Sequence, residues 1–266
     1  MDKNRKDCED VFMRKVAKKL GVYALVGMMT VGGFGATQVK ASTGATTVTA
    51  QAVKQTQKKD FYDVLQTATS VDEVLNYIKK YSKTATKAEM NEYMSGLFSF
   101  CDDIREVNFA KLKSVKKYLP TDVQNALPLL IKEYNTPAMK EGVAKISVEK
   151  LLARTVAYEK YLKKNTSGVA AKAIKNLYEE ELNFAITGGF HKEMALPNTY
   201  ADETGTKVDQ NIISSYKAFV KANSTTKTGK IVSQYVKLLN KTNGKITSKV
   251  QKFYDNLYQT MRKQNL

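Results

Sequence analysis

Apolar side chains recur at intervals of three and four residues along most of the chain beyond residue 60, which is the spacing of amphipathic α-helices. No segment alternates apolar and polar residues around a hairpin turn, as a pair of strands would. We therefore predict an all-α fold, a multi-helix bundle or irregular helical array of about seven to nine amphipathic helices. The apolar stripes comprise Val71, Val74, Leu75, Ile78 and Tyr81; Met90, Tyr93, Met94, Leu97, Phe98, Cys101 and Ile104; Val123, Leu127, Leu130, Ile131 and Tyr134; Val148, Leu151, Leu152, Thr155 and Leu162; Ile174, Leu177, Tyr178, Leu182, Ala185 and Ile186; Ile212, Ile213, Tyr216, Phe219 and Val220; Ile231, Tyr235, Val236 and Leu239; and Ile246, Val250, Phe253, Leu257 and Met261.

Two helix starts carry the pattern of a capping box, in which a Ser or Thr and a Glu three residues later satisfy each other's backbone N–H groups. Ser70 with Glu73 is the first such pair, and Thr86 with Glu89 is the second. Pro128 lies within a later stripe, so that helix is either kinked or begins late, because proline cannot donate the backbone hydrogen bond.

Residues 158–167 resemble residues 216–225, at an offset of 58 positions. The likeness continues without a gap, so that Ile174 corresponds to Val232 and Leu177 to Tyr235. A duplicated helical hairpin is one interpretation. We favour the other, that similar helix-turn-helix chemistry was used twice.

Residues 188–206 begin with two glycines and show no helical period, which predicts a long loop and a sub-boundary within the helical domain. The loop holds the chain's single histidine, His191, with Glu193, Asp202 and Glu203 nearby. A metal site or acid–base pair is conceivable there, but one histidine without a second ligand cluster favours a solvated loop.

The N-terminus has the three parts of a secretory signal peptide. A positively charged flank precedes an uncharged stretch, residues 20–39, and small residues end at Ala41. Five glycines in the stretch argue against a retained membrane helix, since each weakens a helix. We predict a signal peptide over residues 1–41 with cleavage between Ala41 and Ser42, and no stable membrane span after processing.

Translation starts at Met1 or at Met13, because the basic residues that follow Met13 suffice as a flank. Residues 42–59 are small and polar, which predicts a flexible linker ahead of an all-α globular domain over residues 60–266. Cleavage would leave Cys101 as the lone cysteine, so the exported chain cannot form an internal disulfide. This composition favours a bacterial protein that is secreted or associated with the outer side of the cell envelope, with Cys101 as a core thiol.

Charge is distributed unevenly along the chain, whose formal net charge is +17. Residues 207–266 hold twelve basic and two acidic residues, whereas residues 60–106 hold five and nine. One interpretation is that blocks of opposite sign attract one another within the fold. The other is that the C-terminal block faces an external polyanion, such as an anionic cell-envelope polymer. The candidate residues of this block for binding a polyanion are Lys217, Lys221, Lys230, Lys237, Lys245, Lys249 and Lys252.

No catalytic or cofactor motif occurs in the sequence, so we predict a binding protein without enzymatic activity, cofactor or metal. The acidic clusters at Asp102, Asp103 and Glu106 and at residues 179–181 are interpreted as solvated helix faces, although Asp102 and Glu106 would share a face at helical spacing. A helical scaffold for a protein partner is the alternative function. An all-α cell-wall hydrolase is less favoured.

Overall fold

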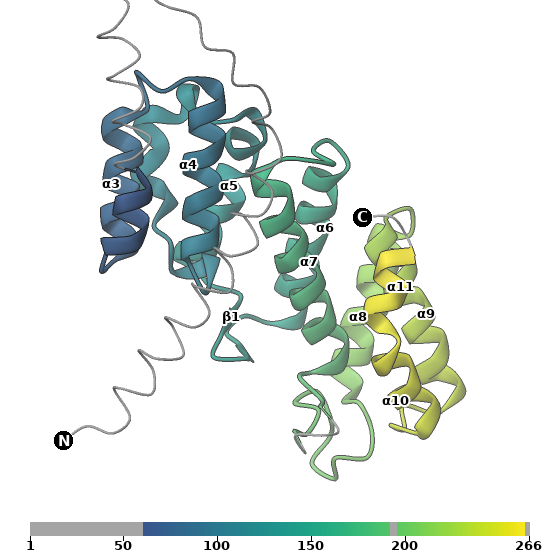
Figure 1. The fold of residues 1–266 in the computed structure, drawn as a ribbon. Coiled ribbons are helices and arrows are strands. Elements are labelled where there is room, and N and C mark those ends of the chain that lie inside the picture. Colours follow the sequence, from purple (N-terminus) through teal and green to yellow (C-terminus); the bar gives the residue numbers. More distant parts are fainter. Residues whose placement is uncertain (1–60, 192–195, 264–266) are drawn as a thin grey trace, which may run out of the picture. The chain divides into compact units, whose positions relative to one another are not determined.

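The computed structural model describes residues 61–191 and 196–263, and this part of the chain is predominantly helical (Figure 1). The all-α prediction is therefore confirmed, and with its two 3₁₀ helices the described part has slightly more helices than expected. The elements are α3 (Val71–Tyr81), α4 (Lys87–Phe100), η1 (Ile104–Glu106), η2 (Phe109–Tyr118), α5 (Thr121–Asn135), β1 (Met139–Lys140), β2 (Val143–Ala144), α6 (Val148–Leu162), α7 (Val169–Thr187), α8 (Gln210–Asn223), α9 (Lys227–Lys241), α10 (Ser248–Asp255) and α11 (Leu257–Lys263).

The predicted signal peptide over residues 1–41, the Ala41–Ser42 cleavage point and the linker over residues 42–59 lie outside the described residues. Among the helices of residues 61–191 and 196–263, none has both the length and the apolar character that crossing a bilayer requires.

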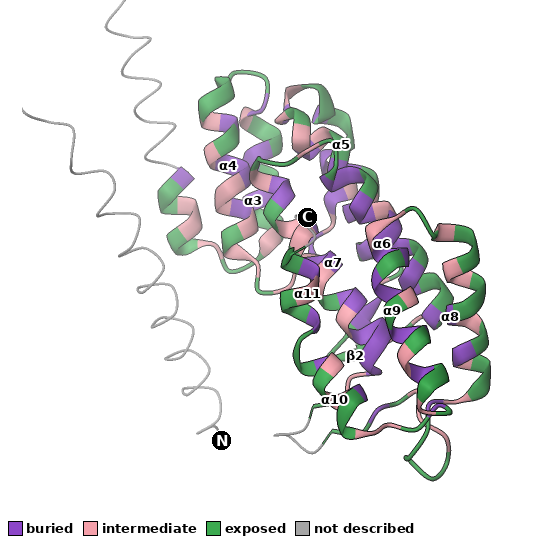
Figure 2. Cartoon of the chain, turned by 90° about the vertical axis from the view of Figure 1, so that its right-hand side faces the viewer, coloured by how far each residue is buried: buried purple, intermediate pink, exposed green. Residues whose placement is uncertain are grey.

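Helix α7 organises the packing of the described part. It is the longest described helix, at 19 residues, and it contacts α4, α5, α6, α9, α10 and α11. Helices α6 and α7 pack against each other, as do α8 and α9, and α6 also contacts both α8 and α9. The buried faces join in one hydrophobic core that runs from Phe61 to Met261 (Figure 2). Burial of apolar surface between neighbouring helices therefore stabilises the whole described part.

The two predicted capping boxes have different outcomes. At α4 the box is confirmed, because Glu89 N–H donates to Thr86 Oγ1 at 3.2 Å and Thr86 N–H donates to Glu89 Oε2 at 2.8 Å. At α3 the prediction is wrong, since the Ser70 side chain makes no cap bond. Instead, the Ser70 hydroxyl donates to Glu73 Oε1 at 3.3 Å, and the Glu73 carboxylate accepts the Thr69 hydroxyl at 2.7 Å and the Thr69 N–H at 3.4 Å.

Two further expectations about backbone structure need correction. Helix α5 runs through Pro128, so the late start is wrong. Strands β1 and β2 form a short antiparallel hairpin that the sequence pattern does not predict. Its two-residue turn, Glu141 and Gly142, has positive φ at both positions, as a type I′ turn requires. The strands are two residues long, too short to show an alternating pattern.

The stripe expected to continue through Cys101 and Ile104 belongs to two helices. Helix α4 ends at Phe100, and Ile104 begins the 3₁₀ helix η1. Asp102 therefore lies between helices and does not share a helix face with Glu106. Cys101 is half-buried at the end of α4, consistent with its interpretation as a core thiol.

The structure extends the similarity between residues 158–167 and 216–225. Helices α7 and α9 begin at residues 169 and 227, which keeps the offset of 58. The Asn165 side chain donates to the Tyr161 carbonyl at 2.9 Å, and the corresponding Asn223 donates to the Phe219 carbonyl at 3.0 Å. The two hairpins thus share helix register and a terminal hydrogen bond, and their duplication stays a hypothesis.

Candidate polyanion-binding surface and a buried ionic cluster

The seven candidate lysines lie on the last helices of the chain, and all seven are exposed. Lys217 and Lys221 are one turn apart on α8, so they share a face. Lys230 and Lys237 are two turns apart on α9 and likewise share a face. The remaining three are Lys245 in the connection between α9 and α10, and Lys249 and Lys252 on α10.

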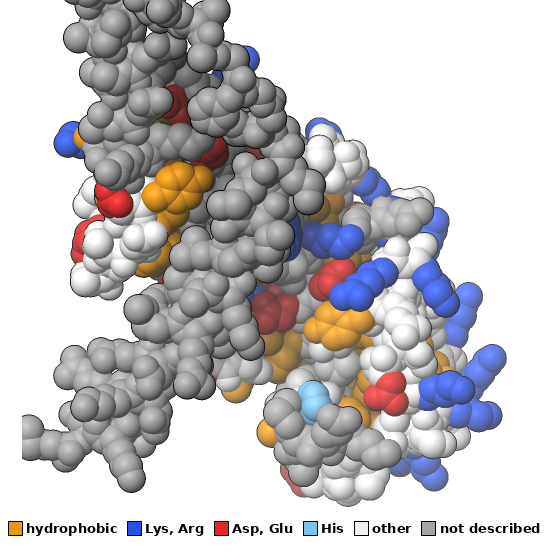
Figure 3. Space-filling model, in the orientation of Figure 1, with side chains coloured by type: hydrophobic (Ala, Val, Ile, Leu, Met, Phe, Trp, Pro, Cys, Tyr) orange, Lys and Arg blue, Asp and Glu red, His pale blue; other side chains and the backbone are white. Residues whose placement is uncertain are grey.

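Some cations elsewhere in the described part are paired with acidic residues, whereas these seven are not. Lys111 contacts Asp72 at 2.7 Å, and Lys163 contacts Glu159 at 2.7 Å. None of the seven lysines forms an ion pair with another described residue. We call these seven residues the lysine surface; they are Lys217, Lys221, Lys230, Lys237, Lys245, Lys249 and Lys252. Figure 3 shows basic side chains gathered over the C-terminal helices with few acidic ones among them.

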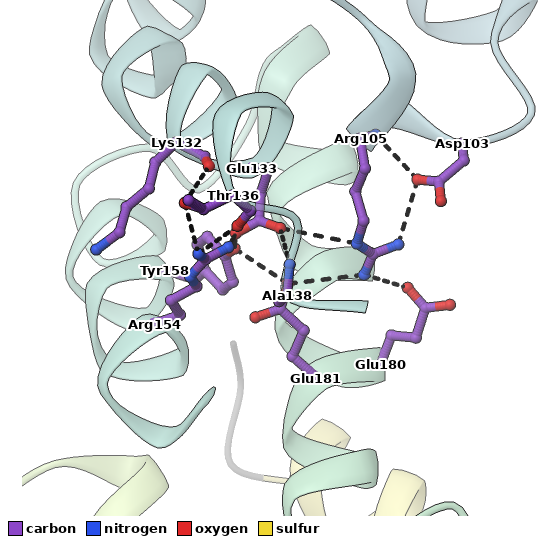
Figure 4. Close-up of polar contacts among 10 residues, drawn as sticks. All are labelled: Asp103, Arg105, Lys132, Glu133, Thr136, Ala138, Arg154, Tyr158, Glu180 and Glu181. Atoms are coloured by element: carbon purple, nitrogen blue, oxygen red, sulfur yellow. Dashed lines mark hydrogen bonds and ion pairs between the residues drawn. The ribbon is translucent and has the colours of Figure 1, made fainter. Parts of the chain in front are cut away.

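A second polar feature, a buried ionic cluster, lies where four elements meet (Figure 4). Arg105 comes from η1, Glu133 from α5, Arg154 and Tyr158 from α6, and Glu181 from α7. All five residues are buried, and Glu133 and Glu181 are 1% and 0% exposed. Charged groups tolerate such burial only when they are paired and hydrogen-bonded.

One half of the cluster surrounds Glu133. Its Oε1 pairs with the Arg154 guanidinium and accepts a 2.7 Å hydrogen bond from the Tyr158 hydroxyl. Its Oε2 accepts the backbone N–H of Ala138 at 3.1 Å. Arg154 also donates to the Thr136 carbonyl and, at 3.2 Å, to the Thr136 hydroxyl. The cluster therefore ties α6 to the end of α5 and to the start of the hairpin.

The other half surrounds Arg105. Its Nη2 donates to Glu180 Oε2 at 2.7 Å, and its Nη1 donates to Asp103 Oδ1 at 3.2 Å. The same guanidinium lies 3.6 Å from Glu181 and 3.8 Å from Glu133. A single arginine thus links η1 to both α5 and α7.

Burial shifts the proton affinity of Glu181. Loss of hydration, followed by the nearby Glu133 charge, raises the pKa of Glu181 to about 8. The pKa of Tyr158 is raised well above its ordinary value, by burial first and then by the Glu181 and Glu133 carboxylates. The arrangement therefore holds a proton near Glu181 around neutral pH. Glu181 and Tyr158 are both buried, so neither side chain is accessible to a substrate in this conformation.

The sequence predicts a solvated helix face for the acidic cluster at residues 179–181, and this is wrong for Glu181, which is buried. The sequence held two signals for the buried cluster. Glu181 lies on the apolar stripe of α7, next to Leu182 and one turn after Leu177. Residues 42–266 contain only three arginines, and two of them, Arg105 and Arg154, are buried here. Arginine suits buried pairs because its planar group donates several hydrogen bonds at once.

The loop over residues 188–206 is tied to the helices around it where it is described. Asn198 is buried and donates to the Tyr254 hydroxyl of α10 at 3.1 Å. Thr199 N–H donates to the Gly188 carbonyl at the end of α7 at 2.9 Å. His191 is exposed, and Glu193 lies outside the described residues. In the part that is described, no group of three or more His, Cys, Asp or Glu side chains is placed to hold a metal ion.

Comparisons with models of known protein families, with curated proteins and with solved structures found no match to this chain. Its function is therefore inferred from the residues and contacts described above.

Proposed function

We propose that this chain is an exported bacterial helical protein that binds an anionic cell-envelope polymer, or another polyanion, through the lysine surface. It acts by association and not by catalysis. After removal of residues 1–41 it would work outside the cytoplasm, either secreted or held at the envelope by this attraction.

The observation that carries the proposal is that all seven lysines are exposed and unpaired within the described residues. Exposed cations that no internal acid neutralises attract polyanions, and binding releases the counterions of the polymer. Affinity gained in this way falls steeply as salt concentration rises. Acidic residues of the fold do contact the C-terminal block: Glu179 lies 3.9 Å from Arg262, and Glu159 accepts the backbone N–H of Lys227 at 2.9 Å. Neither contact involves a member of the lysine surface.

The choice of lysine over arginine indicates what kind of polymer is recognised. An ammonium group is a hydrated point charge, whereas a guanidinium grips phosphate or guanine with two parallel hydrogen bonds. Of the twelve basic residues in residues 207–266, eleven are lysines and one is an arginine, Arg262. We therefore expect attraction to charge density along a polymer, without reading of a sequence or of one sugar type.

The test is binding of the purified protein to linear polyphosphate at several salt concentrations. We expect the logarithm of the affinity to fall linearly with the logarithm of the salt concentration. The slope of this line should shrink by about 0.7 to 0.9 for each contacting lysine that is removed. The test variant carries Gln at Lys217, Lys221, Lys230 and Lys237.

A matched control carries Gln at four exposed lysines of other elements, namely Lys79, Lys83, Lys87 and Lys140. It loses the same net charge, so a general charge effect would weaken both variants equally. Binding that persists unchanged at high salt would reject the electrostatic proposal and favour the protein-interaction scaffold, since buried apolar contacts are not screened.

The export part of the proposal has its own test, which is N-terminal sequencing of the protein recovered from the culture medium or the envelope. We expect Ser42 as the first residue. A chain recovered intact from the cytosol would reject export.

A further inference from the structure

Two lysines of the C-terminal region are held directly opposite each other by the backbone. Lys207 precedes α8 and Lys245 follows α9, and they pair in an antiparallel bridge. The bonds that make the bridge flank the pair: Val208 N–H donates to the Gly244 carbonyl at 3.0 Å, and Ile246 N–H donates to the Thr206 carbonyl at 2.8 Å. Lys207 and Lys245 are thus a non-hydrogen-bonded pair, the type whose side chains approach most closely.

In such a pair the two Cα atoms are about 4.5 Å apart and both side chains leave the same face. Both lysines are exposed, and neither forms an ion pair with another described residue. Like charges placed directly opposite across a bridge destabilise it. The fold therefore holds two positive charges together at a position where one anionic group would relieve their repulsion.

The backbone on both sides of the pair is anchored. Val208 is 1% exposed, and Asp209 begins α8 as its N-cap. On the other side, Gly244 N–H donates to the Leu239 carbonyl at 2.8 Å and has a φ of 76°, which glycine adopts without strain. The spacing of the two lysines is therefore set by helices α8 and α9, although their long side chains remain adjustable.

The Asp202 carboxylate lies close to Lys207 and already accepts several hydrogen bonds. Asp202 N–H donates to the Lys207 carbonyl at 2.7 Å, which places the two residues side by side. The Asp202 carboxylate accepts the Thr204 hydroxyl at 2.7 Å and the N–H groups of Thr206 and Lys207 at 3.3 Å each. These bonds lower the pKa of Asp202, the Thr204 hydroxyl first among them, and direct the carboxylate to the backbone. It makes no ion pair with either lysine.

We propose that Lys207 and Lys245 together form a two-point binding site for one phosphate group of the bound polymer. This inference rests on the proposed function and adds Lys207 to its binding residues. A phosphate or phosphodiester has at least two free oxygens, so each ammonium group donates to a different oxygen of the same group. The remaining members of the lysine surface then attract the rest of the chain without fixing its position.

The experiment measures binding of inorganic tripolyphosphate to the full chain by calorimetry at low salt. The test variant is Lys207→Gln with Lys245→Gln. The control is Lys217→Gln with Lys221→Gln, which removes the same charge from neighbours on α8. We expect the test variant to lose affinity on the order of tenfold, as when charge-assisted hydrogen bonds to one group are removed, and the control to lose about twofold.

Equal losses of affinity in the two variants would overturn the proposed phosphate site while leaving the proposed function intact. The lysine surface would then attract the anion by its overall charge and not at one position. No binding by the unaltered chain would overturn both. A second measurement excludes misfolding as the cause of the loss. Without anion at low salt, the unfolding temperature of Lys245→Gln should equal or exceed that of the unaltered chain, since like-charge repulsion is relieved, and a lower value would contradict the opposed-charge geometry.

Discussion

The Tyr158 hydroxyl lies 3.1 Å from Oε1 of Glu181 and, on its other side, 2.7 Å from Oε1 of Glu133. A tyrosine hydroxyl has one proton, so it can donate to only one of two carboxylates. The shorter contact assigns that proton to Glu133. The contact with Glu181 is then favourable only when Glu181 is protonated and donates to the Tyr158 oxygen. Hydrogen-bond counting and the raised pKa of Glu181 thus agree that this buried carboxyl is neutral.

Glu181→Gln tests this assignment through the pH dependence of stability. The pKa of Glu181 is about 8 in the folded chain and near 4.5 when unfolded, so folding favours the protonated form. The stabilising effect of the protonated Glu181 carboxyl is complete below pH 4.5. It falls by up to about 1.4 kcal/mol per pH unit as pH rises from 4.5 to 8, and it is lost above pH 8. Glutamine stays neutral and can still donate to Tyr158, so urea unfolding between pH 5 and 9 should show a flatter profile.

The groups that face Glu181 are Tyr158, Glu133, Arg105 and Arg154. The matched control is Glu141→Gln in the exposed hairpin turn, which removes one carboxyl without touching the cluster. If Glu181→Gln kept the full pH dependence, Glu181 would not be the group that holds the proton.

Arg154→Ala should be strongly destabilising, by about 3–5 kcal/mol, because it leaves Glu133 buried without its cationic partner. The free energy of unfolding from urea titration measures this loss. The control is Lys150→Ala, an exposed position on the same helix, where we expect a change within about 0.5 kcal/mol.

A double variant separates the charge from the packing of Arg154. Arg154→Met removes the charge but keeps a long side chain, and adding Glu133→Gln to it should recover part of the stability lost in Arg154→Met alone, since an uncompensated buried charge is no longer present. Equal stability of the double and single variants would show that lost packing, not the unpaired carboxylate, dominates.

Two glycines should respond to alanine for different reasons. At Gly142 a methyl group meets no atom within 4 Å, but φ is +73°, so we expect a loss of about 1–2 kcal/mol from backbone strain alone. At Gly229 the added Cβ would overlap the Asn223 carbonyl oxygen, at the junction of α8 and α9. We expect Gly229→Ala to be the more destabilising, because α8 and α9 must separate. Thermal unfolding compares the two, and the reverse order would contradict the close helix contact.

The helices could be predicted because burial repeats along each of them, as Tyr216 and Tyr235 show by lying on their stripes and being 0% exposed. The buried cluster could not be assembled from sequence. Arg105 and Glu180 are 75 positions apart, and their 2.7 Å contact depends on how η1 and α7 pack. Charged residues on an apolar stripe, such as Glu181, mark a site of this kind but do not identify the partner. The charge distribution along the sequence was enough to predict the members of the lysine surface. That Lys207 and Lys245 lie opposite each other could be seen only from the backbone pairing in the structure.

The Cys101 thiol should react slowly with thiol reagents in the folded protein. Burial, followed by the charges of Asp102 and Glu106, raises the pKa of this thiol to about 12, and the thiol donates to the Leu97 carbonyl at 3.1 Å. Since the thiolate is the nucleophile, this shift lowers the reactive fraction at pH 8 by roughly a thousandfold relative to an ordinary cysteine. The measurement is the rate of reaction with a chromogenic disulfide in native buffer and in urea, using Cys8→Ser so that only Cys101 reports. Similar rates in the two conditions would show that this end of α4 opens readily, and would contradict a core role for the thiol.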